Sequence, residues 1–272
     1  MSVKSILCAY SGDPTKGSGL RHAIRVAQHY DAHLTGVAKN GGIPFLHRQF
    51  AAQLPRAVQD QLEENGRVVT EAVEARFHEI TAQAGMSDRA EFLELDADRD
   101  GPIAALARAF DLVVIGHHGS APYEDEFAAH PDLIALRSGR PVLVVPDGYD
   151  TDVLASDVLV AWDGKRAATR ALTAAMPVLA EKAKITLLSV GTTPKNTDRL
   201  ARTIERHGVP VDAITVTARG TIANTILAEA DERAAKLIVM GAFEHSKFSH
   251  DIIGGATTDV LERAAVPILM AH

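Results

Sequence analysis

Val158-Leu159-Val160-Ala161-Trp162-Asp163-Gly164 is a short apolar run that ends in a turn, and Ile6-Leu7-Cys8-Ala9-Tyr10-Ser11-Gly12 is a second stretch of the same kind. A helical pattern follows each stretch at the same distance: Leu172 lies nine residues after Asp163, and Leu20 lies nine residues after Ser11. Continuous apolar runs bounded by turns are typical of parallel strands that are buried on both faces. The chain is therefore predicted to contain the same strand–turn–helix unit twice.

Further landmarks repeat in the same order. An apolar run that ends in glycine occurs at residues 112–116 and again at residues 237–241. About 25 residues later, each copy closes with a proline and another apolar run, at residues 141–145 and 267–270. Matching order and near-equal spacing indicate an internal duplication.

The alternation of strands and helices predicts two tandem, doubly wound α/β domains, each with a five-stranded, mostly parallel sheet flanked by helices. The first domain is expected to span residues 1–148 and the second residues 149–272, with the linker between Tyr149 and Ser156. The predicted strands lie at 4–10, 33–38, 90–95, 111–116 and 141–145 in the first domain, and at 156–162, 184–190, 211–217, 236–240 and 266–271 in the second.

The two copies differ most between their second and third strands. Residues 55–84 of the first copy form a long segment in which apolar residues recur at helical spacing: Val58, Leu62, Val69, Val73, Phe77 and Ile80. Asn65-Gly66 in its middle is a signal that kinks or splits a helix. One interpretation is a helix with one face packed on the sheet, and the other is a dimer contact or a cover over a cleft.

The composition sets the class of protein. With 272 residues, 46% of them apolar and 23% charged, the chain matches an ordinary globular protein of one or two domains. Its apolar runs are much shorter than the ~20 residues of a membrane helix, and its first residues do not resemble a secretory signal. Cys8 is the single cysteine and cannot form an intrachain disulfide. These features lead us to expect a cytoplasmic protein.

The charge is distributed unevenly. The formal net charge is −7, which argues against binding to nucleic acid or an anionic membrane. Residues 1–150 carry 14 basic and 21 acidic side chains, whereas residues 151–272 carry 14 of each. An anionic ligand would therefore meet less repulsion in the second copy.

Candidate binding residues follow the strands of the second copy, because ligands of open α/β sheets bind outside the carboxyl ends of the strands. Asp163 is placed to accept hydrogen bonds from a ribose or to hold a metal ion, or else to serve as a turn residue. The stretch Gly254-Gly255-Ala256-Thr257-Thr258 precedes a predicted helix. Glycines there let backbone N–H groups approach an anion, and Thr257 offers a hydroxyl group. The alternative is that this loop is a solvated surface.

These residues make the chain resemble the universal stress protein family over nearly its whole length, as two tandem copies. Nucleotide-binding members carry Gly, two residues, Gly, nine residues, Gly and then Ser or Thr. The corresponding positions in this sequence are Gly241, Glu244, Gly254 and Gly255, so an acid replaces the second glycine and a glycine replaces the hydroxyl residue. Asp163 matches the family's acid near ribose and metal, and Val190 lies where the family's backbone contacts adenine.

The resemblance implies a stress-response protein whose C-terminal domain weakly binds ATP or another adenine nucleotide, with Mg²⁺ as an optional companion. The fifth strands of its two domains are expected to meet edge to edge as an intrachain pseudo-dimer, with a homodimer left open. The candidate cofactor-binding residues are Ala161, Asp163, Val190, Met240, Gly241, Gly254, Gly255, Ala256 and Thr257.

The first copy departs further from the family pattern. Ser11 replaces the acid, Asp13 lies nearby, and Ala129-His130 stands at the third glycine and its hydroxyl partner. Three acids, Glu124-Asp125-Glu126, lie where a phosphate would bind. This copy is predicted not to bind a triphosphate in the family's usual way.

No catalytic residue or metal ligand is assigned. His117, His118 and His130 lack a regular ligand spacing and are interpreted as loop histidines, and Cys8 as a buried inert thiol. We therefore do not expect an enzyme, although weak ATP hydrolysis stays open by analogy of fold. The competing hypothesis is an interaction or regulatory protein of the same fold that does not depend on nucleotide.

Overall fold

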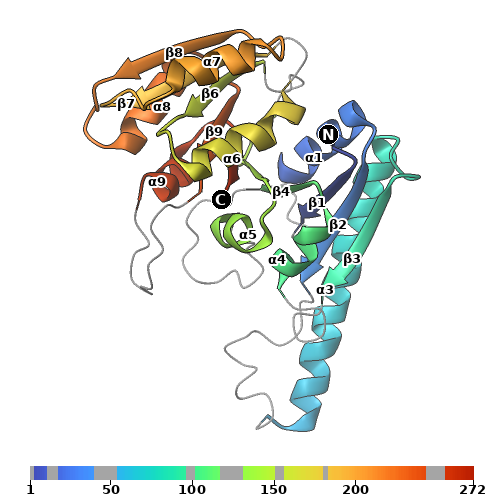
Figure 1. Cartoon of the computed structure of the whole chain (residues 1–272). Coiled ribbons are helices and arrows are strands. Elements are labelled where there is room, and N and C mark those ends of the chain that lie inside the picture. Colours follow the sequence, from blue (N-terminus) through green and yellow to red (C-terminus); the bar gives the residue numbers. More distant parts are fainter. Residues whose placement is uncertain are drawn as a thin grey trace.

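Ten strands form one continuous sheet in the computed structural model of the chain (Figure 1). The structure describes residues 3–10, 18–39, 54–95, 102–116, 131–150, 156–179, 183–242 and 255–272. The strand order is β3-β2-β1-β4-β5-β10-β9-β6-β7-β8. The strands are β1 (Ser5–Ala9), β2 (His33–Lys39), β3 (Ala90–Leu95), β4 (Leu112–Gly116), β5 (Val142–Val145), β6 (Asp157–Ala161), β7 (Lys184–Val190), β8 (Val211–Val216), β9 (Leu237–Gly241) and β10 (Ile268–Ala271). All ten lie within a few residues of the predicted ranges.

Both halves of the sheet repeat one topology. Each half has five parallel strands, and its first strand lies between its second and its fourth. The order of neighbouring strands is the same in β1–β5 and in β6–β10. The predicted fold class, two tandem doubly wound units with parallel sheets, is confirmed. The boundary between residues 148 and 149 stays a prediction.

The two halves are joined by an antiparallel pairing of β5 with β10. Val144 pairs with Ile268, Leu143 with Leu269, and Val142 with Met270. All six side chains are buried. The predicted edge-to-edge contact of the fifth strands is thus confirmed, and it covers the two sheet edges that the separate halves would expose.

Helices cover both faces of the sheet because strand side chains alternate between them. Ile6 and Cys8 of β1 face one side and Leu7 faces the other; Val158 and Leu159 of β6 divide in the same way. The first face is covered by α1 (Ser18–Tyr30), α3 (Arg56–Gln83), α6 (Arg166–Ala175) and α7 (Thr197–Glu205). The second face is covered by α4 (Ile103–Leu106), α5 (Pro131–Ser138), α8 (Ile222–Glu232) and α9 (Ala256–Arg263).

Helix α3 is one continuous helix of 28 residues, so Asn65-Gly66 does not break it. Its C-terminal part packs on the sheet, where the fully buried ring of Phe77 occupies the space beside Gly36. A Cβ atom at Gly36 would lie 2.5 Å from that ring. The N-terminal part extends well beyond the strands (Figure 1), and Val58 and Val69 on it are exposed. Packing on the sheet therefore accounts for the C-terminal part, and a dimer contact or cover stays untested.

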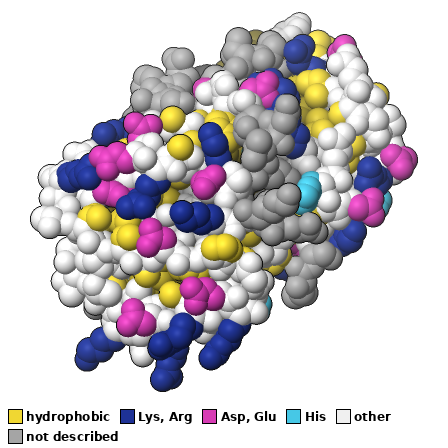
Figure 2. Space-filling view, turned by 90° about the horizontal axis from the view of Figure 1, so that it is seen from above, with side chains coloured by type: hydrophobic (Ala, Val, Ile, Leu, Met, Phe, Trp, Pro, Cys, Tyr) yellow, Lys and Arg dark blue, Asp and Glu magenta, His cyan; other side chains and the backbone are white. Residues whose placement is uncertain are grey.

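The described surface carries charges of both signs. On the face seen in Figure 2, acidic and basic side chains are interspersed, and apolar side chains lie in scattered groups. Within the described ranges, no helix is both long and apolar enough to cross a membrane. The expected lack of nucleic-acid binding stays a prediction.

Residues before the second half contact both halves. The ring of Tyr149 packs on His22 of α1 with a centroid distance of 5.9 Å, and its hydroxyl donates to the carbonyl of Lys236 at 3.4 Å. Asp150 pairs with Arg25 of α1 at 2.5 Å. His22 is 6% exposed, and burial, with a smaller contribution from Arg25, lowers its pKa to about 4.

The stability of the protein is expected to fall as the pH is lowered from about 6.5 to about 4, because the unfolded chain binds a proton at His22 that the folded chain rejects. His22→Gln, measured by urea unfolding, should lose about 2–3 kcal/mol less than the wild type between pH 7 and pH 4.5. The exposed His207→Gln variant is the control and should retain the wild-type dependence. Equal pH dependence in the His22 variant and the wild type would contradict the assignment.

Each half brings a helix close to the end of its fourth strand. A Cβ atom on Gly19 of α1 would lie 2.5 Å from the backbone nitrogen of Gly116. In the second half, a Cβ atom on Gly241 would lie 2.7 Å from the backbone nitrogen of Ala168 and 2.8 Å from Cβ of Ala167. The terminal glycine of the strand is thus required by helix packing in the second half.

Replacing Gly241 with alanine should lower the free energy of unfolding by about 1–3 kcal/mol, because helix α6 must move away from the strand. Gly255→Ser is the control: a Cβ atom at Gly255 has no neighbour within 4 Å, and its φ of −173° suits any residue. The free energy of unfolding of both variants and of the wild type is measured by chemical denaturation. A Gly241→Ala variant as stable as the wild type would show that α6 adjusts freely.

Candidate functional site

The carboxyl ends of β6 and β9 meet at the point where the strand order of the second half reverses. These two strands are parallel neighbours. From β6 the chain passes through α6 to β7 on one side, and from β9 it passes through α9 to β10 on the other. Such a reversal leaves a crevice outside the strand ends, where open α/β sheets bind ligands. Ala161 is the last residue of β6 and Asp163 follows it in the next turn, whereas Met240 and Gly241 are the last two residues of β9.

Asp163 lies in an ordered turn. The residue is exposed, and its Oδ1 atom accepts a hydrogen bond from the backbone N–H of Lys165 at 2.9 Å. Gly164 has a φ of +76°, which favours glycine, and a Cβ atom there would lie 2.7 Å from Cβ of Pro194. The turn interpretation of Asp163 is correct for one carboxylate oxygen. The other oxygen has no partner among the described residues, so the carboxylate retains an acceptor for a ligand.

Trp162 holds this turn in place through two buried hydrogen bonds. Its indole Nε1 donates to Thr197 Oγ1 at 3.2 Å, and that hydroxyl donates to the carbonyl of Pro194 at 2.7 Å. The carbonyl of Trp162 accepts from Ser189 Oγ at 3.1 Å. Trp162, Ser189 and Thr197 are all buried. Our sequence analysis missed this network, for which the single tryptophan beside Asp163 was the available signal.

Val190 is the last residue of the neighbouring strand β7 and is half-buried. Its carbonyl accepts from the N–H of Thr192 at 3.2 Å, and the N–H of Gly191 donates to the carbonyl of Val216 at 2.7 Å. Gly191 has a φ of +84°. The backbone at Val190 is thus held in a turn at the same end of the sheet as Asp163.

The end of β9 is held by the C-terminal residues. The N–H of Ala242 donates to the carbonyl of Ala271 at 2.9 Å, and the carbonyl of Ala242 lies 2.8 Å from Nδ1 of His272. Arg170 of α6 donates to the carbonyl of His272 at 2.6 Å. These contacts, which were absent from our sequence analysis, fix the direction in which the chain leaves Gly241.

The glycine-rich stretch is described only from Gly255 onward. Gly254 and Glu244 lie outside the described residues. Gly255 is the N-cap residue of α9 and provides no side-chain cap; Ala256 and Thr257 begin the helix, with Thr257 9% exposed. Because Gly255 is extended and has open space beside Cα, no steric requirement accounts for glycine there.

The other sequence-based candidates belong to the first half. Ser11, Asp13, the histidines at 117, 118 and 130, and the acids at 124–126 lie outside the described residues. Among the described residues no group of His, Cys, Asp and Glu is arranged to hold a metal ion. Cys8 is fully buried, and burial raises the pKa of its thiol to about 12, so the interpretation as an inert thiol is supported.

Comparisons with known proteins identify one family. Residues 193–272 match the Universal stress protein family. A curated universal stress protein of Synechocystis is 25% identical over 170 residues, which span 59% of this chain and 57% of that protein. The chain thus aligns with little more than half the length of this relative.

Two solved structures share the fold over nearly the whole chain. A universal stress protein from Archaeoglobus fulgidus matches with a TM-score of 0.71 and 18% identity, covering 98% of this chain and 96% of the other. A structure described as a putative universal stress protein from Pseudomonas aeruginosa matches with a TM-score of 0.56 and 16% identity, covering 98% and 92%.

The C-terminal family match, the curated relative and a fold in which one strand pattern occurs twice therefore agree with the resemblance found in the motifs: residues 193–272 match the universal stress protein family, and the sheet repeats the same topology in both halves.

Proposed function

We propose that the C-terminal half of this protein binds an adenine nucleotide at the carboxyl ends of β6, β7 and β9. Similarity to the universal stress protein family supports a role in the stress response. The observation that carries the nucleotide proposal is the ordered turn of Asp163, which lies at the strand-order reversal with one carboxylate oxygen unengaged by described residues. A preorganised acceptor at such a point suits a ribose hydroxyl pair or a bound Mg²⁺ ion.

Each candidate residue has a role in this proposal. Asp163 binds the ribose or Mg²⁺, and Ala161 and Met240 line the ends of their strands. The backbone of Val190 contacts adenine. The phosphates bind to the glycine-rich segment and to the start of α9. The candidate residues there are Gly241, Gly254, Gly255, Ala256 and Thr257. The N-terminal end of a helix favours negative charge because its first N–H groups are unpaired.

The phosphate end of this site is weaker than the ribose end. Gly255 supplies no hydroxyl group at the N-cap of α9. Glu244, eleven residues before Gly255 in the sequence, adds a negative charge to the segment that would meet phosphates. We therefore expect weak binding that gains little from the β- and γ-phosphates, so that AMP and ATP bind with similar affinity.

A protein that acts without nucleotide is the second candidate. It is favoured by the use of Asp163 Oδ1 in its own turn and by the missing hydroxyl at Gly255. On this hypothesis the conserved topology supports an interaction surface, and the protein shows no affinity for ATP, ADP or AMP at millimolar concentration.

Calorimetric titration with ATP and MgCl₂ is expected to show binding that Asp163→Asn weakens about tenfold, since a hydrogen bond to a charged group contributes about 1.5–3 kcal/mol. Asparagine keeps an oxygen for the N–H of Lys165, so the melting temperature should not change. Asp231→Asn on α8 replaces another exposed aspartate and is the matched control. Equal affinity in the Asp163 variant and the wild type would remove the carboxylate from the site.

Gly255→Ser is expected to strengthen ATP binding by up to about tenfold, because a serine hydroxyl at this N-cap can donate to a phosphate oxygen. The same titration with AMP should change much less. If neither the wild type nor the Gly255→Ser variant binds any adenine nucleotide at millimolar concentration, the nucleotide-independent hypothesis stands instead.

A further inference from the structure

A second cavity lies at the amino ends of β6 and β7, at the opposite end of the strands from Asp163. Its volume is about 240 Å³. It is lined by Asp157, Val158, Leu159, Lys184, Thr186, Arg233 and Ala235. Drug-sized ligands occupy about 300–1,000 Å³, so this cavity suits a smaller molecule.

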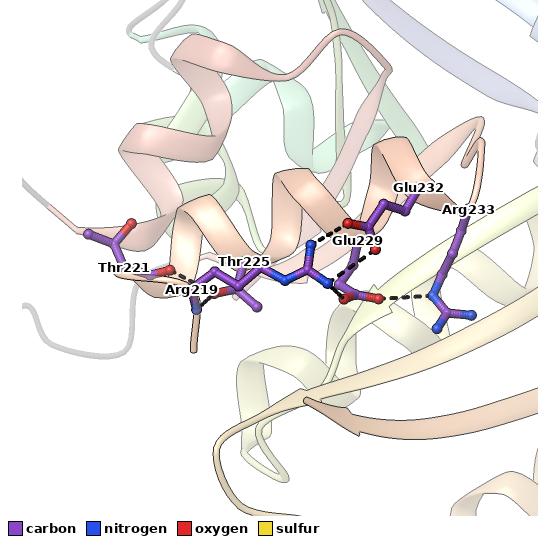
Figure 3. A network of polar contacts seen from close by, with 6 residues as sticks. All are labelled: Arg219, Thr221, Thr225, Glu229, Glu232 and Arg233. Atoms are coloured by element: carbon purple, nitrogen blue, oxygen red, sulfur yellow. Dashed lines mark hydrogen bonds and ion pairs between the residues drawn. The ribbon is translucent and has the colours of Figure 1, made fainter. Parts of the chain in front are cut away.

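Arg233, which lines the cavity, belongs to an ionic network around the buried carboxylate of Glu229 on α8 (Figure 3). The side chain of Glu229 is 4% exposed and accepts from Nη2 of Arg219 at 3.0 Å and from Nε of Arg233 at 3.1 Å. Arg219 also pairs with Glu232, and its backbone N–H donates to Thr225 Oγ1 at 2.7 Å. A buried carboxylate with two guanidinium partners is fully compensated, so the network fixes the side chain of Arg233 in one orientation.

Arg233 retains a donor for the cavity. Nε is bound to Glu229, and Nη1 lies 3.7 Å from Oδ2 of Asp212 on β8. Nη2 has no partner among the described residues. Arg233 thus lines the cavity while two of its nitrogens contact the carboxylates of Glu229 and Asp212.

Asp157 and Lys184 line the cavity with opposite charges and, within the described structure, do not form an ion pair with each other. Asp157 and Lys184 occupy partner positions on the neighbouring strands β6 and β7. They also share a sheet face with Leu159 and Leu188, because side chains alternate along a strand. Yet among the described residues no ion pair within 4.0 Å joins them, and only Ser156 Oγ binds the Asp157 carboxylate, at 3.0 Å. Thr186, two residues after Lys184 on the same strand and opposite Leu159, also lines the cavity; its side chain is 9% exposed, and its hydroxyl has no partner among the described residues.

We propose that this cavity binds a small zwitterion of the α-amino acid type. The carboxylate of the ligand would lie between Lys184 and Arg233, and its ammonium group would face Asp157. Thr186 would bind either end of the ligand through its hydroxyl. Asp157 and Lys184 are both exposed residues, so the selectivity comes from the number of charge-assisted contacts: a zwitterion binds the two side chains together, whereas a simple anion or cation binds only one of them. This proposal does not depend on the nucleotide site.

The test is titration of the ¹⁵N-labelled full chain with L-alanine, followed by amide chemical shifts. The expected result is saturable movement of the amides of Thr186 and Ala235. Acetate and methylammonium chloride, each with half of the zwitterion's charge, should bind at least about tenfold more weakly. Prior saturation with ATP should not compete, because the nucleotide site is at the other end of the strands.

Two neutral substitutions test the residues. Lys184→Gln and Asp157→Asn should each weaken alanine binding about tenfold without changing the melting temperature, because neither side chain forms an ion pair within the described structure. Lys195→Gln, which replaces an exposed lysine after β7, is the matched control and should bind as the wild type does.

Three outcomes would overturn the proposal. They are an absence of saturable shifts with L-alanine, equally tight binding of acetate alone, and unchanged affinity in both the Lys184→Gln and Asp157→Asn variants. Equally tight acetate binding would identify an anion site in place of a zwitterion site.

Discussion

The antiparallel contact between β5 and β10 is the interaction on which the rest of the structure depends. Each half of the chain ends in a strand whose outer edge would present unpaired backbone groups to solvent, and these two edges satisfy each other. The side chains at the junction are fully buried on both faces, so the apolar layers of the two halves become continuous. Burial on both faces explains why central strands such as β4, β5 and β10 are apolar without alternation.

The second constraint is the close approach of a helix to the last residue of the fourth strand. Gly116 meets Gly19 in the first half, and Gly241 meets Ala167 and Ala168 in the second. This contact fixes the start of α6, and therefore the turn that precedes it, against the end of β9. The turn of Asp163 is held on its other side by Trp162 and Thr197. The turn of Asp163 is thus held by packing on both sides, although Glu244 and Gly255 depart from the family pattern.

Most of the fold was predictable from the chain, whereas much of the site was not. Every strand was predicted to within a few residues. In the central strands the signal was the continuous apolar run that burial on both faces requires, whereas β3 and β8 at the sheet edges contain charged residues. Asn65-Gly66 suggested a broken helix, but α3 continues through it. Local turn propensity is a weak signal inside a long helix whose later turns pack on the sheet through Phe77. The turn at Asp163 was predicted, while its hydrogen bond to Lys165 and the network around Trp162 required the three-dimensional arrangement.

By itself, the sequence determined the repeat, the strand boundaries and the α/β class. It also showed that Glu244 and Gly255 differ from the nucleotide-binding motif of the universal stress protein family. These features are encoded locally, in the period of apolar residues and in the residue type at each position. Only the tertiary structure decided which residues act together. Glu229 with Arg219 and Arg233, and Asp157 with Lys184, meet through strand register and helix docking, which bring together residues that are separated along the chain. The amino-end cavity arises from that packing and has no motif in the sequence.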